Sequence, residues 1–389
     1  MCGIVGAVAQ RNVVGILTEG LKRLEYRGYD SAGIAVIDKD SVLQVRKAVG
    51  KVINLEKTIS ELPTKGSSGI AHTRWATHGK PAFNNAHPHS SGSIAVVHNG
   101  IIENYLALRT ELIAAGYEFV SETDTEVIAH LVHQLLQTEG SLLSAVQKAI
   151  EKFDGAYGLG VIDSRNPDQI VTARSGSPLV VGVGIEENFI ASDQMALRQV
   201  TDRFIYLEEG DVAVVTSTSV DIFDSSRKKV DRDLVTLSGK EETADKGKFR
   251  HYMAKEIHEQ ASVLKNTLQG RLSKTKLLEE VFGIEAGLIF DQVESIQIVA
   301  CGTSYHAGLV AKYWFEDWAG LPCQVEVASE FRYRKVAVQK NTLFVTISQS
   351  GETADTLAAL RAAKVAGYLA GLTICNVANS SLVRESDLC

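Results

Sequence analysis

Cysteine is scarce in this sequence of 389 residues, and none of its five cysteines forms a C-x-x-C pair. An odd number of unpaired cysteines argues against a disulfide framework and against a zinc ribbon. The N-terminus has no basic segment followed by a long apolar run, and no other apolar run is long enough to cross a bilayer. We therefore expect neither a signal peptide nor a membrane span, and a reducing, cytoplasmic setting.

Basic residues are also in the minority, with 40 Lys and Arg against 47 Asp and Glu and a net charge of -7. A nucleic-acid partner is not expected, because such proteins need a basic face. Hydrophobic residues make up 45%, which is ordinary for a folded globular protein. The length predicts two or three domains.

The first 240 residues combine short apolar strands with amphipathic helices in no strict alternation. Strands are predicted for CGIVGAVA, SAGIAVID, SGIAHTRW and SIAVVHNG, and for several segments between residues 155 and 235. Helices are predicted for NYLALRTELIAAGY, for TEVIAHLVHQLLQ, and for residues 13–28, which end at a capping Gly28. This mixture indicates an α+β layered domain over residues 2–239.

A polar, highly charged stretch at residues 239–249 is the candidate linker, and residues 240–285 are assigned to the linker and an interdomain helix. One face of that helix carries Ile257, Ala261, Leu264 and Leu268. A strand, a Gly/Ser turn and a helix then follow one another three times, which predicts a doubly wound α/β domain with a parallel sheet over residues 286–389. The sequence stops at Cys389 within this repeated strand–turn–helix pattern, so we expect the domain to be incomplete.

Cys2 is the residue that points most directly to chemistry. Methionine is readily trimmed before a small second residue, and the new terminus would carry a thiol and a free α-amine. The amine titrates near about 7.7–8.0 and the thiol near about 8.5, so a base and a nucleophile arrive together without a histidine. N-terminal threonine hydrolases use the same logic. The alternative is a cysteine that merely follows the initiator Met1.

An amide-hydrolysing cysteine needs donors for the oxyanion of its tetrahedral intermediate. Asn99 and Gly100 follow an apolar strand, and an Asn side-chain amide with a Gly backbone N–H is a suitable donor pair. The alternative for this dipeptide is a plain Asn-Gly hairpin turn, which could also present both donors.

Charged residues nearby match the groups of a zwitterionic amino acid such as glutamine. Arg74 offers a guanidinium fork for the α-carboxylate, with Thr77 and His78 as further donors. Asp124 offers a carboxylate for the α-amine. The alternative for Asp124 is an acidic residue at a helix start, where it favours the helix dipole.

Histidines are dense in this region, at His72, His78, His87, His89 and His98. A metal-dependent hydrolase is therefore a rival hypothesis. Neither H-x-x-x-H nor H-E-x-x-H spacing occurs among these histidines, and no cysteine lies near them in the sequence. We expect no metal site.

Two turns in the second domain carry glycine and small hydroxyl residues between a strand and a helix: CGTS at residues 301–304 and SQSGET at residues 348–353. Backbone N–H groups at a helix N-terminus favour an anion such as a phosphate, and adjacent strand ends are where open α/β sheets bind ligands. The alternative is helix capping by Ser and Thr. Neither turn matches a Walker A loop or a G-x-G-x-x-G fingerprint, which argues against nucleotide binding.

Five segments of the first domain resemble, in order, the motifs of class II glutamine amidotransferases: CGIVGAVA, RLEYRGYDSAG, AHTRWATHG, VVHNGIIEN and SETDTEV. They are most similar to the glutamine–fructose-6-phosphate aminotransferase (glucosamine-6-phosphate synthase) family. The resemblance implies an N-terminal nucleophile fold, which is a four-layer αββα sandwich.

The resemblance also implies a role for each candidate residue. Cys2 attacks the side-chain amide of glutamine and forms a γ-glutamyl thioester, while Asn99 and Gly100 bind the oxyanion. The backbone groups of glutamine are held by Arg74, Thr77, His78 and Asp124. Trp75 resembles the gate of an ammonia channel and Arg27 the residue that closes the site. Core packing is the alternative for Trp75, since it is the commoner fate of a tryptophan.

The turns ACGTS and SQSGETADT resemble the SIS sugar isomerase domain of the same family. The residues that would hold the sugar phosphate are Thr303, Ser304, Ser348, Gln349, Ser350 and Thr353. The family's ring-opening and isomerising groups, an essential lysine among them, lie beyond the part that this sequence matches.

The family's reaction aminates fructose 6-phosphate with nitrogen from L-glutamine, gives glucosamine 6-phosphate for hexosamine biosynthesis, and needs no cofactor. We expect a homodimer at full length and mainly glutaminase activity in this chain. Two alternatives stay open, namely a phosphoribosylpyrophosphate-dependent amidotransferase and a sugar-phosphate sensor whose first domain is inert.

Overall fold

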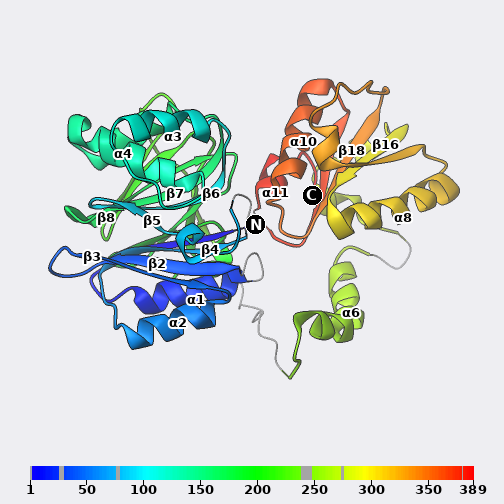
Figure 1. Cartoon of the computed structure of the whole chain (residues 1–389). Coiled ribbons are helices and arrows are strands. Elements are labelled where there is room, and N and C mark those ends of the chain that lie inside the picture. Colours follow the sequence, from blue (N-terminus) through cyan, green and yellow to red (C-terminus); the bar gives the residue numbers. More distant parts are fainter. Residues whose placement is uncertain (1, 26–29, 76–78, 238–247, 273–275, 379) are drawn as a thin grey trace. The chain divides into compact units, whose positions relative to one another are not determined.

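The computed structural model describes residues 2–25, 30–75, 79–237, 248–272, 276–378 and 380–389. The chain divides into two compact units, Met1–Ala244 and Asp245–Cys389, which we describe separately (Figure 1). Most of the expected linker at residues 239–249 lies outside the described residues, and the domain boundaries expected from the sequence stay predictions.

The first unit contains two antiparallel sheets. The larger has eight strands in the order β15 (Leu234–Thr236), β11 (Arg203–Tyr206), β9 (Val180–Val183), β10 (Glu187–Ala191), β1 (Gly3–Ala9), β4 (Ser68–Arg74), β2 (Ser31–Ile37) and β3 (Leu43–Val49). The smaller has seven, in the order β14 (Lys229–Val230), β13 (Val220–Phe223), β12 (Val212–Thr216), β8 (Asn166–Ser175), β7 (Gly155–Asp163), β6 (Ile94–Ile102) and β5 (His89–Ser91).

Helices cover the outer face of each sheet. The eight-stranded sheet packs on α1 (Val14–Leu24) and α2 (Val52–Glu61), and the seven-stranded sheet packs on α3 (Tyr105–Ala114), α4 (Thr125–Glu139) and α5 (Leu142–Ile150). A third apolar core, with Ile4, Ile70 and Val97, joins the two sheets to each other. These layers form the four-layer αββα sandwich that the resemblance to amidotransferases implied (Figure 1).

The alternation of side chains along β1 explains its central place in this sandwich. Val5 and Ala7 pack toward α1, whereas Ile4 and Val8 pack toward the other sheet. Successive strand residues point to opposite faces, so a strand that is apolar at every position is buried on both sides. β1 is hydrogen-bonded to β4 on one edge and to β10 on the other.

Two local predictions need correction. Helix α1 ends at Leu24 with Glu25 as its C-cap, earlier than the expected cap at Gly28, which lies outside the described residues. Asn99 and Gly100 do not form a hairpin turn. They lie within β6 and pair with Gly158 and Tyr157 of β7, because the strand continues to Ile102.

The second unit contains a parallel sheet in the order β17 (Cys323–Val327), β16 (Ser295–Ala300), β18 (Thr342–Ser348) and β19 (Ala370–Cys375). One face packs on α7 (Ala286–Phe290) and α8 (Gly302–Ala319), and the other on α9 (Ala328–Phe331), α10 (Ala354–Ala366) and α11 (Ser381–Glu385). The predicted doubly wound α/β architecture is confirmed. Among the described residues, the short 3₁₀ helices are η2 (Phe83–Asn85), η3 (Gln194–Ala196) and η4 (Glu279–Phe282).

The amphipathic helix predicted after the linker is present as α6 (Tyr252–Leu268). Its apolar face is not covered in the part of the chain that the structure describes, since Ile257 is 59% exposed and Leu264 is 64% exposed. Among the described helices, none combines the length and the apolar character that a bilayer crossing requires.

Candidate active site

Cys2 lies directly before β1, at the end of the strand where β4 and β6 also bring polar side chains. Its Sγ accepts a hydrogen bond from the backbone N–H of Trp75 at 3.2 Å and lies 3.5 Å from the Trp75 carbonyl oxygen. Strand pairing explains this contact, since Gly3 pairs with Thr73 and the next residues of β4 therefore reach Cys2. The sulfur is thus held by the main chain rather than by a histidine.

The charge state of the Cys2 thiol depends on opposing effects. Burial raises its pKa, whereas the hydrogen bond from Trp75 lowers it. Asp30 raises the pKa further and Arg74 lowers it. Burial is the largest of these effects, so the thiol must give its proton to a base before it can act as a nucleophile.

Asn99 and Gly100 are brought to Cys2 by β6. Asn99 Nδ2 donates to the Cys2 carbonyl oxygen at 3.1 Å, and Asn99 Oδ1 lies 3.0 Å from His72 Nε2. Gly100 has a φ of +130°, and a Cβ at this position would lie 2.0 Å from the carbonyl oxygen of Ala156. Only glycine fits this backbone conformation at the position next to Asn99.

Arg74 and Asp124 are both buried at this end of the unit, with side chains 3% and 6% exposed. Arg74 donates to the carbonyl oxygen of Gly79 at 2.8 Å and lies 3.8 Å from Asp30 Oδ1. Asp124 Oδ2 accepts a hydrogen bond from the Ile102 N–H at 2.9 Å. Asp124 precedes α4, but its side chain makes no capping hydrogen bond to that helix.

Trp75 is 48% exposed, so the core-packing alternative for this tryptophan is wrong. Arg27, Thr77 and His78 lie outside the described residues. Their expected roles in gating and in glutamine binding stay predictions.

The histidines of this region form hydrogen bonds with each other, with a main-chain carbonyl oxygen and with threonine hydroxyls. His72 Nε2 lies 3.0 Å from the His98 carbonyl oxygen, His72 Nδ1 lies 3.0 Å from His87 Nδ1, and His89 Nε2 lies 3.0 Å from Thr123 Oγ1. Within the described ranges, no group of three His, Cys, Asp or Glu side chains is arranged to hold a metal ion. The sequence singled out His72 and His87 only as candidate metal ligands, and it gave no sign of their contact with Asn99.

In the second unit, strand pairing brings the two hydroxyl-rich turns together. Ala300 of β16 pairs with Ile347 of β18, so both turns leave the carboxyl edge of the sheet side by side. The strand order places them where the chain reverses its direction of progress across the sheet, which is where such folds bind ligands.

The side chains of these turns differ in exposure. Thr303 and Gln349 are exposed, Ser304 and Thr353 are half-buried, and Ser348 and Ser350 are buried. Ser348 Oγ accepts from the Gly351 N–H at 3.0 Å, and Ser350 Oγ accepts from the Glu352 N–H at 3.2 Å. Thr353 precedes α10, but its side chain makes no capping hydrogen bond to that helix. The helix-capping alternative therefore does not apply to Thr353.

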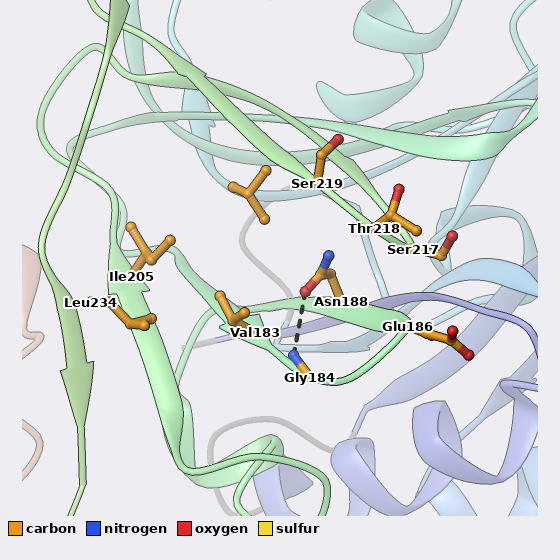
Figure 2. Close-up of a pocket in the computed structure, with 10 residues that line it drawn as sticks. Val183, Gly184, Glu186, Asn188, Ile205, Ser217, Thr218, Ser219 and Leu234 are labelled. Carbon is orange, nitrogen blue, oxygen red and sulfur yellow. Dashed lines mark hydrogen bonds between the residues drawn. The ribbon is translucent and has the colours of Figure 1, made fainter.

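A separate hollow of about 350 Å³ lies in the first unit, between the turn that joins β9 to β10 and the turn that joins β12 to β13. Figure 2 shows its lining, in which Asn188 accepts a hydrogen bond from the Gly184 N–H and Glu186 is the charged side chain. None of the candidate residues named from the sequence lines this hollow.

Comparison with known protein families finds a match within each unit. Residues 72–199 match the model of a glutamine amidotransferase domain, and residues 289–389 match that of a SIS domain. In fold, the chain is similar to a glutamine phosphoribosylpyrophosphate amidotransferase from B. subtilis, with a TM-score of 0.50 and 17% identity over 96% of this chain and 81% of that one.

Similarity in sequence is much closer to another group. The chain is 62% identical over its whole length to the glutamine--fructose-6-phosphate aminotransferase [isomerizing] of Pseudomonas putida, and 61% identical to that of Haemophilus influenzae. It spans 64% of the length of each of these curated relatives. Over the part of these relatives that it spans, the chain is similar in sequence to glutamine--fructose-6-phosphate aminotransferases, and it matches the models of a glutamine amidotransferase domain and a SIS domain.

Proposed function

We propose that the chain hydrolyses the side-chain amide of L-glutamine, with Cys2 as the nucleophile after removal of Met1. The observation that carries this proposal is the pair of donors at Cys2: the Trp75 N–H donates to its sulfur, and Asn99 Nδ2 donates to its carbonyl oxygen. The identity to glutamine-dependent aminotransferases supports glutamine as the substrate.

The proposed reaction has two halves. The free α-amine of Cys2 takes the thiol proton, and the sulfur attacks the amide carbon of glutamine. Asn99 Nδ2 and the Gly100 N–H stabilise the oxyanion that forms. The C–N bond then breaks, the nitrogen leaves as ammonia after receiving the proton, and a γ-glutamyl thioester remains. Water hydrolyses this thioester to glutamate and restores the thiol.

Substrate binding is assigned to the charged residues around the sulfur. Arg74 binds the α-carboxylate, together with Thr77 and His78, and Asp124 binds the α-amine. The guanidinium of Arg74 donates to the carbonyl oxygens of Gly79 and Lys80, and its planar fork has the geometry that binds a carboxylate. Trp75 and Arg27 gate the site in this proposal, and the exposure of the Trp75 side chain supports a role outside the core.

The whole protein is proposed to pass this ammonia to fructose 6-phosphate and to release glucosamine 6-phosphate. Thr303, Ser304, Ser348, Gln349, Ser350 and Thr353 would hold the sugar phosphate. The adjacency of their two turns at the carboxyl edge of one sheet supports that assignment. For the longer protein we keep the predictions of a homodimer and a cytoplasmic location.

The test is glutamate release from L-glutamine by the 389-residue chain. Cys2→Ala is expected to reduce the rate at least about 10³-fold, because the nucleophile is lost. Intact mass after treatment with a glutamine-like diazoketone should show one adduct on Cys2 in a chain that lacks Met1. Equal rates for the two proteins, or a purified chain that hydrolyses glutamine with Met1 in place, would refute the proposal.

Phosphate binding by the second unit is tested separately, by calorimetric titration with fructose 6-phosphate. Ser348→Ala and Thr303→Val should weaken binding, whereas Cys2→Ala should not. Unchanged affinity in both second-unit variants would remove these residues from the proposed site.

A further inference from the structure

A chain of hydrogen bonds runs from Cys2 into the interior through Asn99, His72 and His87. Asn99 Nδ2 lies 3.1 Å from the Cys2 carbonyl oxygen, Asn99 Oδ1 lies 3.0 Å from His72 Nε2, and His72 Nδ1 lies 3.0 Å from His87 Nδ1. The two histidines are 1% and 6% exposed. The chain crosses from the seven-stranded sheet to the eight-stranded sheet, since Asn99 lies on β6 and His72 on β4.

The chemistry of the end group fixes the orientation of the Asn99 amide. The Cys2 carbonyl oxygen can only accept a hydrogen bond, so the Asn99 atom that faces it is the NH₂ group. The amide oxygen Oδ1 therefore faces His72. His72 Nε2 also lies 3.0 Å from the His98 carbonyl oxygen, which is a second acceptor. Both neighbours of Nε2 accept, so Nε2 carries the proton.

The same logic continues to His87. Burial lowers the pKa of His72 to about 3, so the ring is neutral near pH 7 and its Nδ1 is a bare acceptor. His87 Nδ1 must then carry the proton that joins the two rings. Burial also holds the pKa of His87 well below its ordinary value, which leaves His87 Nε2 unprotonated. Every proton in the chain is thus assigned.

The direction of this chain matters because an Asn amide has two nearly equivalent orientations. Its terminal torsion is broad and roughly two-fold, so Asn99 could present either NH₂ or oxygen to Cys2. The flipped orientation would place an acceptor beside the developing oxyanion and would repel it. In that orientation His72 Nε2–H would also face the NH₂ group, donor against donor.

We propose that His72, supported by His87, is a positioning residue that keeps the NH₂ group of Asn99 turned toward Cys2. The inference rests on the proposed function, in which Asn99 Nδ2 stabilises the oxyanion. It also gives the buried histidines a purpose, which is to hold the Asn99 amide in one orientation. In that orientation one N–H of the amide bonds to the Cys2 carbonyl oxygen, and the second N–H of the same group faces the substrate.

Packing around His87 supports a fixed geometry. Gly33 on β2 pairs with His72 of β4, and a Cβ on Gly33 would lie 2.2 Å from the His87 carbonyl oxygen. The His87 main chain therefore lies directly against the sheet that carries His72. The His87 ring also meets the His72 ring edge to face, with ring centroids 4.1 Å apart. His72 has little room to turn.

The test uses two amide variants that imitate one ring nitrogen each. The amide nitrogen of Gln reaches the position of His Nε2, and that of Asn reaches the position of His Nδ1. His72→Asn should lower kcat for glutamine hydrolysis about 10- to 100-fold with little change in KM, which is less than the roughly 10²–10³-fold that complete loss of an oxyanion donor costs. His72→Gln should lose at least about fivefold less than His72→Asn. Equal losses in the two variants would overturn the inference.

Alkylation of Cys2 by iodoacetamide provides a readout that a general structural defect would change. This displacement forms no oxyanion, so its rate should stay within about twofold in His72→Asn. A parallel fall in alkylation and kcat would show a disturbed site and would overturn the positioning role. If His72→Asn does not fold, His72→Leu and His87→Leu are measured in the same way.

A double-mutant cycle separates this inference from the proposed function. His72 acts through Asn99, so adding His72→Asn to Asn99→Ala should cause no further loss of kcat. Multiplied losses would overturn the positioning role while leaving Cys2 as the nucleophile. Undiminished hydrolysis by Cys2→Ala would instead refute the proposed function, whatever the His72 variants do.

Discussion

The two candidate sites of this chain differ in how the protein holds their side chains. In the first unit, Arg74 and Asp124 are buried and bonded to main-chain groups of neighbouring segments. In the second unit, Thr303 and Gln349 are exposed, and the bonds of Ser348 stay within its own turn. The first site is therefore part of the folded core, whereas the second consists of turns at the carboxyl edge of the parallel sheet. Substitutions in the first should change both stability and activity.

The largest contrast that we expect is in acid, which should lower the free energy of unfolding of the first unit more than that of the second. His72 has a pKa of about 3 when folded and near about 6.5 when unfolded, so above pH 6.5 it is neutral in both states. Between pH 6.5 and pH 3 the unfolded chain binds a proton that the folded chain does not, and the free energy of unfolding falls as the pH falls. The loss at pH 5 is about 2 kcal/mol for each such histidine, and His87 adds to it in the same direction.

Hydrogen exchange followed by mass spectrometry from pH 7.5 to pH 5 measures this effect in each unit. Peptides from β4 and β6 should lose protection before peptides from β16 and β18. In His72→Gln the pH dependence of β4 and β6 should be shallower by one proton. A common loss of protection in both units would remove the proposed difference.

Two glycines with positive φ give the next largest contrast. Gly100→Ala would place a Cβ 2.0 Å from the Ala156 carbonyl oxygen at a φ of +130°, and should cost about 3 kcal/mol of unfolding free energy. Gly302→Ala meets no described atom within 4 Å at a φ of +58°, and should cost about 1 kcal/mol. Chemical denaturation followed separately for each unit checks the order of the two costs.

The smallest contrast in unfolding free energy is expected between loss of the buried Asp124 carboxylate and loss of the half-buried Thr353 hydroxyl. Asp124→Ala leaves the buried Ile102 N–H without its acceptor and should cost about 1–3 kcal/mol, with faster exchange of that amide. Thr353→Ala should cost no more than about 0.5 kcal/mol. Asp124→Asn keeps an oxygen for Ile102, so the amide should stay protected while KM for glutamine rises. Rapid exchange in this variant would mean that the charge, and not the bond, holds the strand.

Much of the fold follows from local patterns in the sequence. β1, β4, β6 and α4 appear as continuous apolar or periodic segments, and the second unit shows the regular strand–turn–helix order. β3 was missed because LQVRKAV mixes charged and apolar residues, as suits an edge strand that is only half-buried. The alternative of an Asn99–Gly100 hairpin turn was wrong because the dipeptide's preference for a turn yields to nine residues of pairing between β6 and β7.

The site could be predicted only for residues whose type by itself indicates a chemical role. Cys2, Asn99 and Asp124 have such types, and the structure brings them to one end of the sandwich. The contact of His72 with Asn99 could not be predicted, because it joins residues 27 positions apart on strands of different sheets. The hydrophobic pattern of a strand does not indicate which strand of the other sheet it faces.

The place of β1 has a consequence for the newly made chain. β1 is synthesised before both of its partner strands, β4 and β10, which end near residues 74 and 191. At about 5–20 residues per second, some 10–40 seconds pass before the second partner has been synthesised. Throughout that interval β1 is not yet held in its sheet, which would give a peptidase time to remove Met1, as the proposed role of the Cys2 amine requires.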